Sequence, residues 1–179
     1  MNRTIQFVLI ATVLPLTQAN TQALSQDAGA TNEDLINVSA EVEAGAAAFK
    51  SGDVIAAMRH YRTAADAGSN DAKVRLAWIL DQSEDNVGAF RLYSEAAEAG
   101  DPAGQFGLAE LYANGEGIKR NVRRAVDLFE AAAAQGHVRA MTVLVSAYAE
   151  GGLGLVPNAD RSDYWQTKLA ETQQAENEQ

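Results

Sequence analysis

The residues best suited to chemistry are few in this chain of 179 residues. It has no cysteine and two histidines, His60 and His137. A zinc site needs three or four histidine, cysteine or carboxylate ligands at characteristic spacings, and no such triad is present. No nucleophile elbow surrounds a serine. We therefore predict that the chain is not an enzyme and has no catalytic residue, no metal site and no cofactor.

Two further patterns could bind anions. The glycine-rich run at residues 151–154 (GGLG) lacks the Lys-Ser or Lys-Thr of a phosphate-binding loop, so it is interpreted as a hinge between helices. Lys119, Arg120, Arg123 and Arg124 form a basic cluster at a predicted helix start. The sequence leaves open whether this cluster pairs with nearby acids or meets an anionic partner segment.

Helices must position these residues, because small and apolar residues recur in columns. Gly104, Leu108, Ala109 and Tyr112 have offsets of zero, four, five and eight, which share one face of an α-helix. The columns recur 32 residues earlier and 36 residues later. They hold Ala72, Leu76, Ala77 and Leu80 in the earlier copy, and Ala140, Leu144, Val145 and Tyr148 in the later one.

A second helix repeats with the same shifts. Its columns hold Ala125, Leu128, Phe129, Ala132, Ala133 and Gly136, then Ala89, Leu92, Tyr93, Ala96, Ala97 and Gly100, then Ala57, His60, Tyr61, Ala64, Ala65 and Gly68. A weaker fourth copy follows. We expect Tyr61, Tyr93 and Phe129 to lie buried between layers. His60 takes a leucine column and is interpreted as a packing residue, while His137 follows a glycine and is interpreted as a loop residue.

Helix boundaries have their own signals. Gly68, Gly100 and Gly136 fall where a helix needs a left-handed residue to stop. Asp101-Pro102 supplies a cap and a first-turn proline, and we expect caps at Asp53, Asp85, Asn121 and Asn158. The predicted helices span residues 40–49, 54–67, 72–80, 87–99, 103–113, 122–135, 138–150 and 160–170.

Two strings of residues carry a family resemblance. They are Leu108-Ala109-x-x-Tyr112-x-x-Gly115-x-Gly117-Ile118 and Arg124-Ala125-x-x-Leu128-Phe129-x-x-Ala132-Ala133-x-x-Gly136. Together they resemble the Sel1-like repeat, a relative of the tetratricopeptide repeat, over roughly residues 40–170. The first two units lack the Gly-x-Gly hinge. The resemblance implies an all-α fold, a right-handed α/α solenoid of about four helix-turn-helix repeats.

Four segments are expected. Residues 1–19 have a short apolar run after Arg3 and small residues at the end, which is typical of a secretory signal peptide; an uncleaved membrane anchor is the alternative. Residues 20–38 are predicted to form a flexible polar linker, residues 39–170 the solenoid, and residues 171–179 a disordered polar tail. We expect a periplasmic or secreted protein without stable membrane insertion once the signal is removed.

The partner is expected to be a protein or peptide. The chain has 24 acidic and 14 basic residues, and this acidic balance disfavours binding to nucleic acid. Positions three, six and ten of each first helix should face away from the packed layer, toward the concave groove of such solenoids. Six of these residues are the predicted partner-binding set: Arg75, Trp78, Gln82, Glu110, Asn114 and Ser146. Trp78 is either an interface anchor or a residue packed on the glycine-free loop. The oligomeric state is left open.

The resemblance implies a non-enzymatic adaptor, since Sel1-like proteins act mainly as scaffolds. Exported bacterial members include regulators of sensor kinases, so control of an envelope complex or a sensor kinase is one expected role. A secreted hydrolase or binder of cell-wall or β-lactam ligands is the alternative. Relatives linked to such ligands are rich in cysteine, which this chain lacks.

Overall fold

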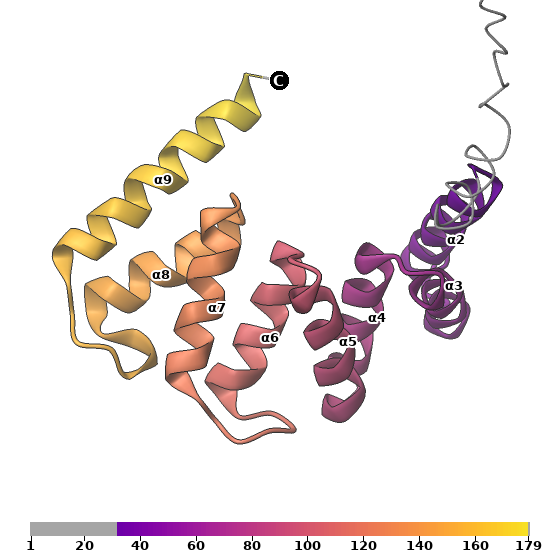
Figure 1. The fold of residues 1–179 in the computed structure, drawn as a ribbon, viewed down its shortest axis with the longest axis horizontal. Helices are drawn as coiled ribbons and strands as arrows, with labels where there is room; N and C mark the ends of the chain where they lie inside the picture. The colour runs from indigo at the N-terminus through magenta and orange to yellow at the C-terminus, as the bar shows by residue number, and fades with distance from the viewer. Residues whose placement is uncertain (1–31, 179) are drawn as a thin grey trace, which may run out of the picture. The chain divides into compact units, whose positions relative to one another are not determined.

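The computed structural model of the chain describes residues 32–178, and within that range the secondary structure is helical without strands (Figure 1). Eight α-helices carry the labels α2 to α9, and a short 3-10 turn, η1 (Gly152–Gly154), precedes the last. The helices are α2 (Asn32–Lys50), α3 (Val54–Asp66), α4 (Asn70–Gln82), α5 (Asn86–Glu98), α6 (Pro102–Asn114), α7 (Val122–Ala134), α8 (Val138–Glu150) and α9 (Ala159–Asn177). The predicted all-α helical repeat solenoid is confirmed.

Helices α3 to α9 pack in chain order, each mainly against the next one along the chain. Contacts between α4 and α6 also bring the first helices of two pairs side by side. This is the arrangement of a repeat array, in which a helix pair buries its apolar stripe only against its neighbours.

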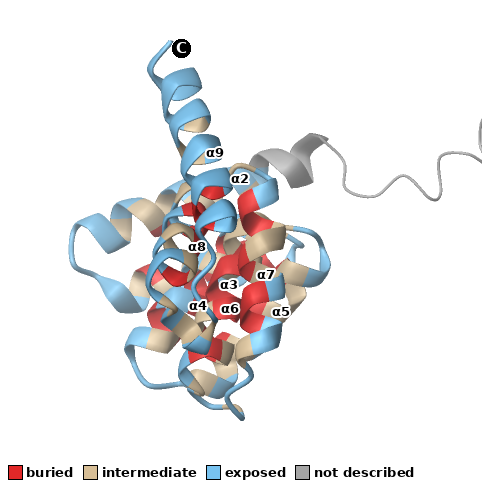
Figure 2. Ribbon diagram, turned by 90° about the vertical axis from the view of Figure 1, so that its left-hand side faces the viewer, coloured by how far each residue is buried: buried red, intermediate tan, exposed pale blue. Residues whose placement is uncertain are grey.

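The alanine columns form the closest contacts between helices. Ten of these alanines have no exposed surface: Ala57, Ala64, Ala72, Ala77, Ala89, Ala96, Ala109, Ala125, Ala132 and Ala140. A methyl side chain lets two helix backbones approach closely without leaving a void. Figure 2 shows the buried residues gathered where the helices face one another.

The large aromatic residues of the second helices fill the space between layers. Tyr61, Tyr93 and Phe129 are 3%, 5% and 2% exposed, which confirms their predicted burial. The ring of Tyr93 lies against Gly107 on α6, where an added Cβ would meet its Cε1 atom at 2.3 Å. Gly45 on α2 leaves the same kind of room for Tyr61. In each case a glycine on the facing helix leaves the space that the tyrosine ring occupies.

The predicted stop glycines and helix caps are confirmed. Gly68, Gly100 and Gly136 have φ angles of +96°, +83° and +89°, which a residue with a Cβ rarely adopts. The side chain of Asp101 accepts a hydrogen bond from the Gly104 N–H at 2.8 Å, and Pro102 occupies the first turn of α6. Caps also form at the four predicted positions: Asp53, Asp85, Asn121 and Asn158.

Each helix pair is closed by one equivalent backbone hydrogen bond. The N–H of the cap of the second helix donates to the carbonyl of column eight of the first helix. The bonds run from Asp53 to Ala48, Asp85 to Leu80, Asn121 to Tyr112 and Asn158 to Tyr148, at 2.8 to 2.9 Å. This hydrogen bond forms in every pair although the loops between the helices differ in length. Loop length therefore sets the repeat period and does not change how the two helices of a pair are joined.

Two segment boundaries differ from the sequence-based expectation. Helix α2 begins at Asn32, inside the range expected to be a linker. Helix α9 continues to Asn177, through most of the residues expected to form a disordered tail. The predicted signal peptide, residues 1–19, lies outside the described residues.

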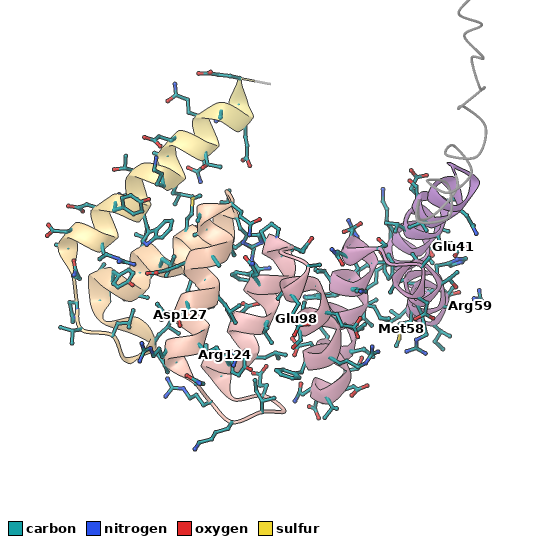
Figure 3. All side chains as sticks on the ribbon, viewed as in Figure 1. Glu41, Met58, Arg59, Glu98, Arg124 and Asp127 are labelled. Carbon is teal, nitrogen blue, oxygen red and sulfur yellow. The ribbon has the colours of Figure 1, made fainter. Side chains whose placement is uncertain are left out.

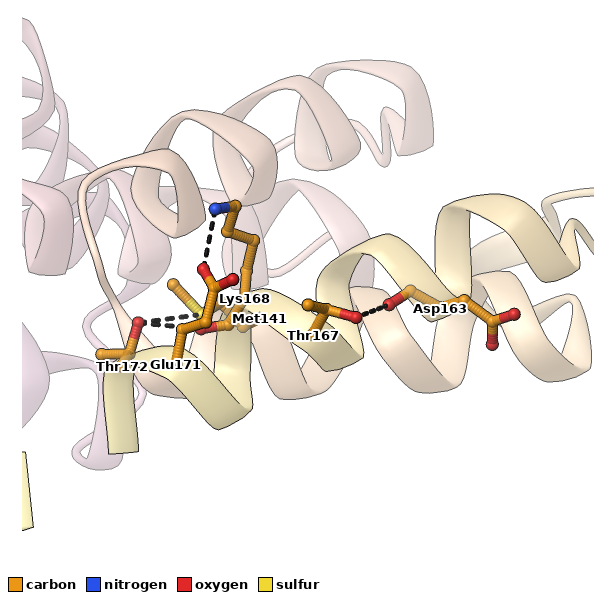
Figure 4. A network of polar contacts seen from close by, with 6 residues as sticks. All are labelled: Met141, Asp163, Thr167, Lys168, Glu171 and Thr172. Carbon is orange, nitrogen blue, oxygen red and sulfur yellow. Dashed lines mark hydrogen bonds and ion pairs between the residues drawn. The ribbon is translucent and has the colours of Figure 1, made fainter. Parts of the chain in front are cut away.

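Contacts with α8 explain why α9 continues. Past residue 170 the hydroxyl of Thr172 points to the sulfur of Met141 at 3.9 Å, and Lys168 pairs with Glu171 at 2.8 Å (Figure 4). Trp165 and Leu169 pack into the core beside α8. A polar sequence with pairs three or four residues apart is compatible with a helix once one face has a partner.

Candidate functional site

A groove runs across several first helices. Its volume is about 260 Å³, and its lining comes from the end of α2, from α4 and α6, from the start of α8, and from Tyr61 of α3 and Tyr93 of α5. Its aromatic residues include the partly exposed Phe49 and Trp78 and the buried Phe106, and Arg75, Glu110 and Arg139 are its charged residues. A mostly apolar hollow with a few polar groups is the usual form of a binding site.

The structure brings together three of the six predicted partner-binding residues. Arg75, Trp78 and Glu110 line the groove. Gln82 and Asn114 do not line it, since each is the last residue of its helix. The Asn114 amide instead donates to the Glu116 side chain at 3.1 Å.

Ser146 lies in a separate, shallower hollow with Val143, Glu150 and Leu153. The reason is that only the first turn of α8 reaches the groove, through His137 and Arg139. Residues at the same repeat position, such as Trp78, Glu110 and Ser146, therefore do not all line the same groove. Partner binding by the six residues remains a prediction.

The surroundings of Trp78 distinguish its two interpretations. Its ring meets Phe49 of α2 edge to face, with centroids 5.6 Å apart, and the side chain is 44% exposed. It therefore packs on the preceding first helix, which favours the anchor interpretation over packing on the loop at residues 83–85. An exposed indole in a groove has the properties of an anchor for a bound segment.

The charged groups of the groove are unequally paired. The Arg75 guanidinium donates to Asp71 at 2.8 Å, which raises the pKa of Arg75. Arg139 lies over the Phe106 ring, 4.5 Å from its centroid, and 3.6 Å from a Glu110 oxygen. Burial raises the pKa of Glu110, while Arg139 acts in the opposite direction.

Several groove residues were not among the sequence-based candidates. Phe49 lies in the last turn of α2, Phe106 lies two residues after Gly104 in α6, His137 caps α8, and Arg139 lies in its first turn. His137 lies between α7 and α8, as predicted for a loop residue, and it also caps α8, because its Nδ1 accepts the Ala140 N–H at 3.2 Å. The aromatic side chains of Phe49 and Phe106 on the first helices were a usable signal.

The other residues singled out from the sequence, His60 and the basic cluster, mostly make contacts within the fold. His60 Nδ1 lies 2.7 Å from Glu41 of α2, so its packing column also carries a polar contact. In the basic cluster, Arg120 donates to the Ala113 carbonyl at 2.8 Å and Arg124 lies over the Tyr112 ring. Over the described residues no group of histidine, cysteine and carboxylate side chains could hold a metal ion.

The outer faces of the second helices carry scattered charges. Figure 3 shows Arg59 on α3, Glu98 on α5, and Arg124 and Asp127 on α7. All four are exposed, and their signs alternate along the array. Exposed apolar residues also occur on the second helices, since Ile55 of α3 and Val87 of α5 are 83% and 73% exposed. None of the described helices is both long enough and apolar enough to span a bilayer.

The sequence matches the family model of the Sel1 repeat over residues 43–69, 72–101 and 102–137, more than half of the chain. A solved Sel1 repeat protein from Oxalobacter formigenes is 30% identical, with a TM-score of 0.68 over 76% of this chain. A sel1 repeat protein of Klebsiella pneumoniae subsp. pneumoniae is 22% identical, with a TM-score of 0.62 over 79% of this chain and 72% of its own.

A third solved structure is c5321, a protective antigen present in uropathogenic Escherichia coli strains that displays an SLR fold. It is 24% identical, with a TM-score of 0.57 over 67% of this chain. The match spans 58% of the Oxalobacter protein and 29% of c5321, so these relatives are longer than the region shared with them. No protein of curated function matches the sequence.

Proposed function

This chain belongs to the Sel1 repeat family, and from that premise we propose that it is a non-enzymatic adaptor that holds a segment of a partner protein in the groove. Proteins built from Sel1 repeats generally mediate protein–protein interaction. Their fold is typically a non-catalytic scaffold.

The observation that carries the proposal is the exposed Trp78 in an apolar groove formed by several first helices. Aromatic residues that remain accessible in such hollows are enriched among the residues that dominate interface energies. The Phe49 ring holds Trp78 from one side, which limits the side-chain entropy lost on binding.

The site of action proposed is the bacterial periplasm. This rests on the signal-like residues 1–19, and amino-terminal sequencing of the protein recovered from a periplasmic fraction tests it. A mature chain beginning near Asn20 is expected. A chain that keeps Met1 and stays in the cytoplasm would contradict export.

The regulated target, an envelope complex or a sensor kinase, follows from family resemblance alone and remains a prediction. The alternative role toward cell-wall or β-lactam ligands is favoured by no observation on the described part of the chain. Purified protein is expected to leave a chromogenic β-lactam unchanged.

Site-specific photocrosslinking tests the groove. A photoreactive side chain at Arg75 is expected to capture a partner in the envelope of the producing cells, and Trp78→Ala should reduce that adduct about tenfold or more. The matched control places the same group at Arg59, on the exposed outer face of α3. Equal adducts from Arg59 and Arg75, unaffected by Trp78→Ala, would reject the groove as the binding surface.

A further inference from the structure

Two arginines line the groove, and one carboxylate opposes them. Arg75 of α4 and Arg139 of α8 both belong to its lining, and Glu110 of α6 is the only acidic residue among the described residues that line it. The side chains of Arg75 and Arg139 are 47% and 71% exposed, so an incoming group can reach both. The groove is therefore locally basic, although the chain as a whole has a net charge of −10.

Both guanidinium groups keep N–H donors that the fold does not use. An arginine has five such donors. Nε of Arg75 donates to Asp71 at 2.8 Å, and the two terminal nitrogens of Arg75 have no hydrogen-bond partner among the described residues. Arg139 lies 3.6 Å from Glu110, beyond hydrogen-bond distance, and donates to no other described residue. Both groups can therefore bind a carboxylate through paired hydrogen bonds.

Aromatic side chains adjoin both arginines. Trp78 follows Arg75 by three residues, so both lie on one face of α4 with a rise of about 4.5 Å between them. The Arg139 guanidinium lies over the Phe106 ring, 4.5 Å from its centroid. Such stacking restricts the guanidinium, and less side-chain entropy is lost when it binds an acid. The groove thus offers an exposed indole beside accessible cations.

The size of the groove favours side chains of a bound segment over a separate small molecule. Its volume is about 260 Å³, whereas small-molecule sites are about 300–1,000 Å³. In an extended segment, alternate side chains point to the same side and lie about 6.6 Å apart. An apolar residue and an acid two positions away from it can therefore face the groove together.

Glu110 is the group that works against an acidic segment. Burial raises the pKa of Glu110, and the charge of Arg139 acts in the opposite direction. Burial and Arg139 both lower the pKa of His137, which keeps this histidine uncharged near neutral pH. The charge of the groove is therefore set by the two arginines and Glu110.

This inference rests on the proposed function. We infer that the groove selects an acidic partner segment: a bulky apolar side chain of the segment lies against Trp78, and aspartate or glutamate residues near it are received by Arg75 and Arg139. Charge complementarity of this kind sets specificity more than affinity. The repulsion from the acidic surface elsewhere is screened over about 10 Å at 0.1 M salt, so the local contacts decide.

Octapeptide libraries on a solid support provide the probe, with leucine at position five and Glu, Gln or Lys at positions three and seven. Gln has nearly the shape of Glu, so the ratio of Glu to Gln binding reports the charge. At about 0.15 M salt the labelled full-length chain is expected to bind the Glu library about threefold more than the Gln library, and about tenfold more than the Lys library.

Variants of the groove should change the ratio of Glu to Gln binding in both directions. Arg75→Gln and Arg139→Gln should each lower it, and the double variant should abolish the preference. Glu110→Gln removes the opposing charge and should raise the ratio.

The matched control is Arg91→Gln, which removes the same charge. Arg91, like Arg75, is an exposed arginine paired with an acid four residues away, Glu95 at 2.7 Å, but it does not line the groove. It should leave the ratio unchanged, and far-UV circular dichroism checks that each variant folds.

The outcomes separate the inference from the proposed function. Equal binding of the Glu, Gln and Lys libraries, abolished by Trp78→Ala, overturns the acidic preference and leaves the groove as a peptide site. A preference for the Lys library overturns it too, as does a Glu preference that Arg91→Gln lowers as much as the double variant does. Binding of no library, or binding unaffected by Trp78→Ala, rejects the groove as a peptide site and the inference with it.

Discussion

The second and third helix pairs, α4–α5 and α6–α7, place equivalent residues in equivalent environments wherever helices touch. Leu76 and Leu108 are both buried, and Tyr93 of one pair matches Phe129 of the other. Away from these columns the pairs differ, since position six holds Trp78 in one and Glu110 in the other. The buried columns thus fix the stacking, and the exposed positions are free to shape the groove.

The two pairs also differ in their loops. Residues 83–85 make a short loop in which Glu84 has a φ of +61°, while residues 115–121 make a longer one with Gly115 at +82°. Both loops still deliver the cap N–H to column eight of the first helix. Packing of the helices therefore tolerates different turn chemistry, provided that this closure is kept.

The largest expected effect comes from removing a shared packing residue. Phe129→Ala should lower the free energy of unfolding by about 3–5 kcal/mol, because it leaves a cavity where Phe129 also meets Phe106. Urea denaturation followed by circular dichroism measures it. The partly exposed Trp78→Ala serves as control and should cost clearly less; equal losses would contradict the division between packing and groove residues.

The next effect tests how closely the pairs approach. At Gly104 an added Cβ would lie 2.5 Å from the Ala96 Cβ, whereas the equivalent Ala72 is accommodated in α4. Gly104→Ala should lower the free energy of unfolding by about 1–3 kcal/mol through overpacking. Thermal unfolding compares it with Gln105→Ala, a neighbour on the partly exposed side. No loss at Gly104 would show that α5 and α6 can separate without cost.

Removing a glycine from the longer loop and introducing one into the shorter loop should change the stability in opposite directions. Gly115→Ala places a side chain at positive φ and 3.1 Å from the Arg120 Cβ, so it should destabilise by about 1 kcal/mol. Glu84→Gly removes the corresponding strain and should stabilise by about 0.5 kcal/mol, the gain being offset partly by chain entropy. Chemical denaturation of both variants measures the change in the free energy of unfolding. Changes of the same sign would contradict this prediction.

The smallest effect is a pH dependence at the first helix of the fourth pair, α8. The equivalent caps are Ser69, Asp101 and His137, and only the histidine titrates near neutral pH. Burial, with Arg139 as a second cause, lowers the pKa of His137. The unfolded chain then takes up a proton more readily, so stability from this group is complete above about pH 6.5 and falls as pH drops through the lowered pKa.

The measurement is the thermal midpoint at about pH 7.5 and about pH 5.5, compared with His137→Asn. Asparagine keeps a capping oxygen but does not titrate. The wild type should lose more stability than the variant between the two values. An identical loss in both would assign the pH effect to the carboxylates.

The sequence allowed most of the fold to be predicted, because each helix carried its own signals. The alanine columns, the tyrosines and Phe129, the glycines at helix ends and the four caps are all where the pattern placed them. The limits of α2 and α9 were missed. Their outer turns lack the repeat columns, and the end of α9 is stabilised by contacts such as that of Thr172 with Met141, which no local pattern encodes.

The groove was predicted only in part. Arg75, Trp78 and Glu110 were found from their positions on the first helices, but Phe49, Phe106 and Arg139 were not. Position alone also selected Gln82, Asn114 and Ser146, which lie elsewhere. A helical register says which residues point away from a layer, and it does not say how far along the helix the neighbouring layer extends.

What the sequence determined by itself was the periodic burial, because helix pairing depends on residues a few turns apart and repeats with the same shifts. The tertiary structure alone decided which exposed residues meet. The Phe49–Trp78 contact and the Arg139–Phe106 stacking join different repeats, and they depend on how one helix pair is set against the next.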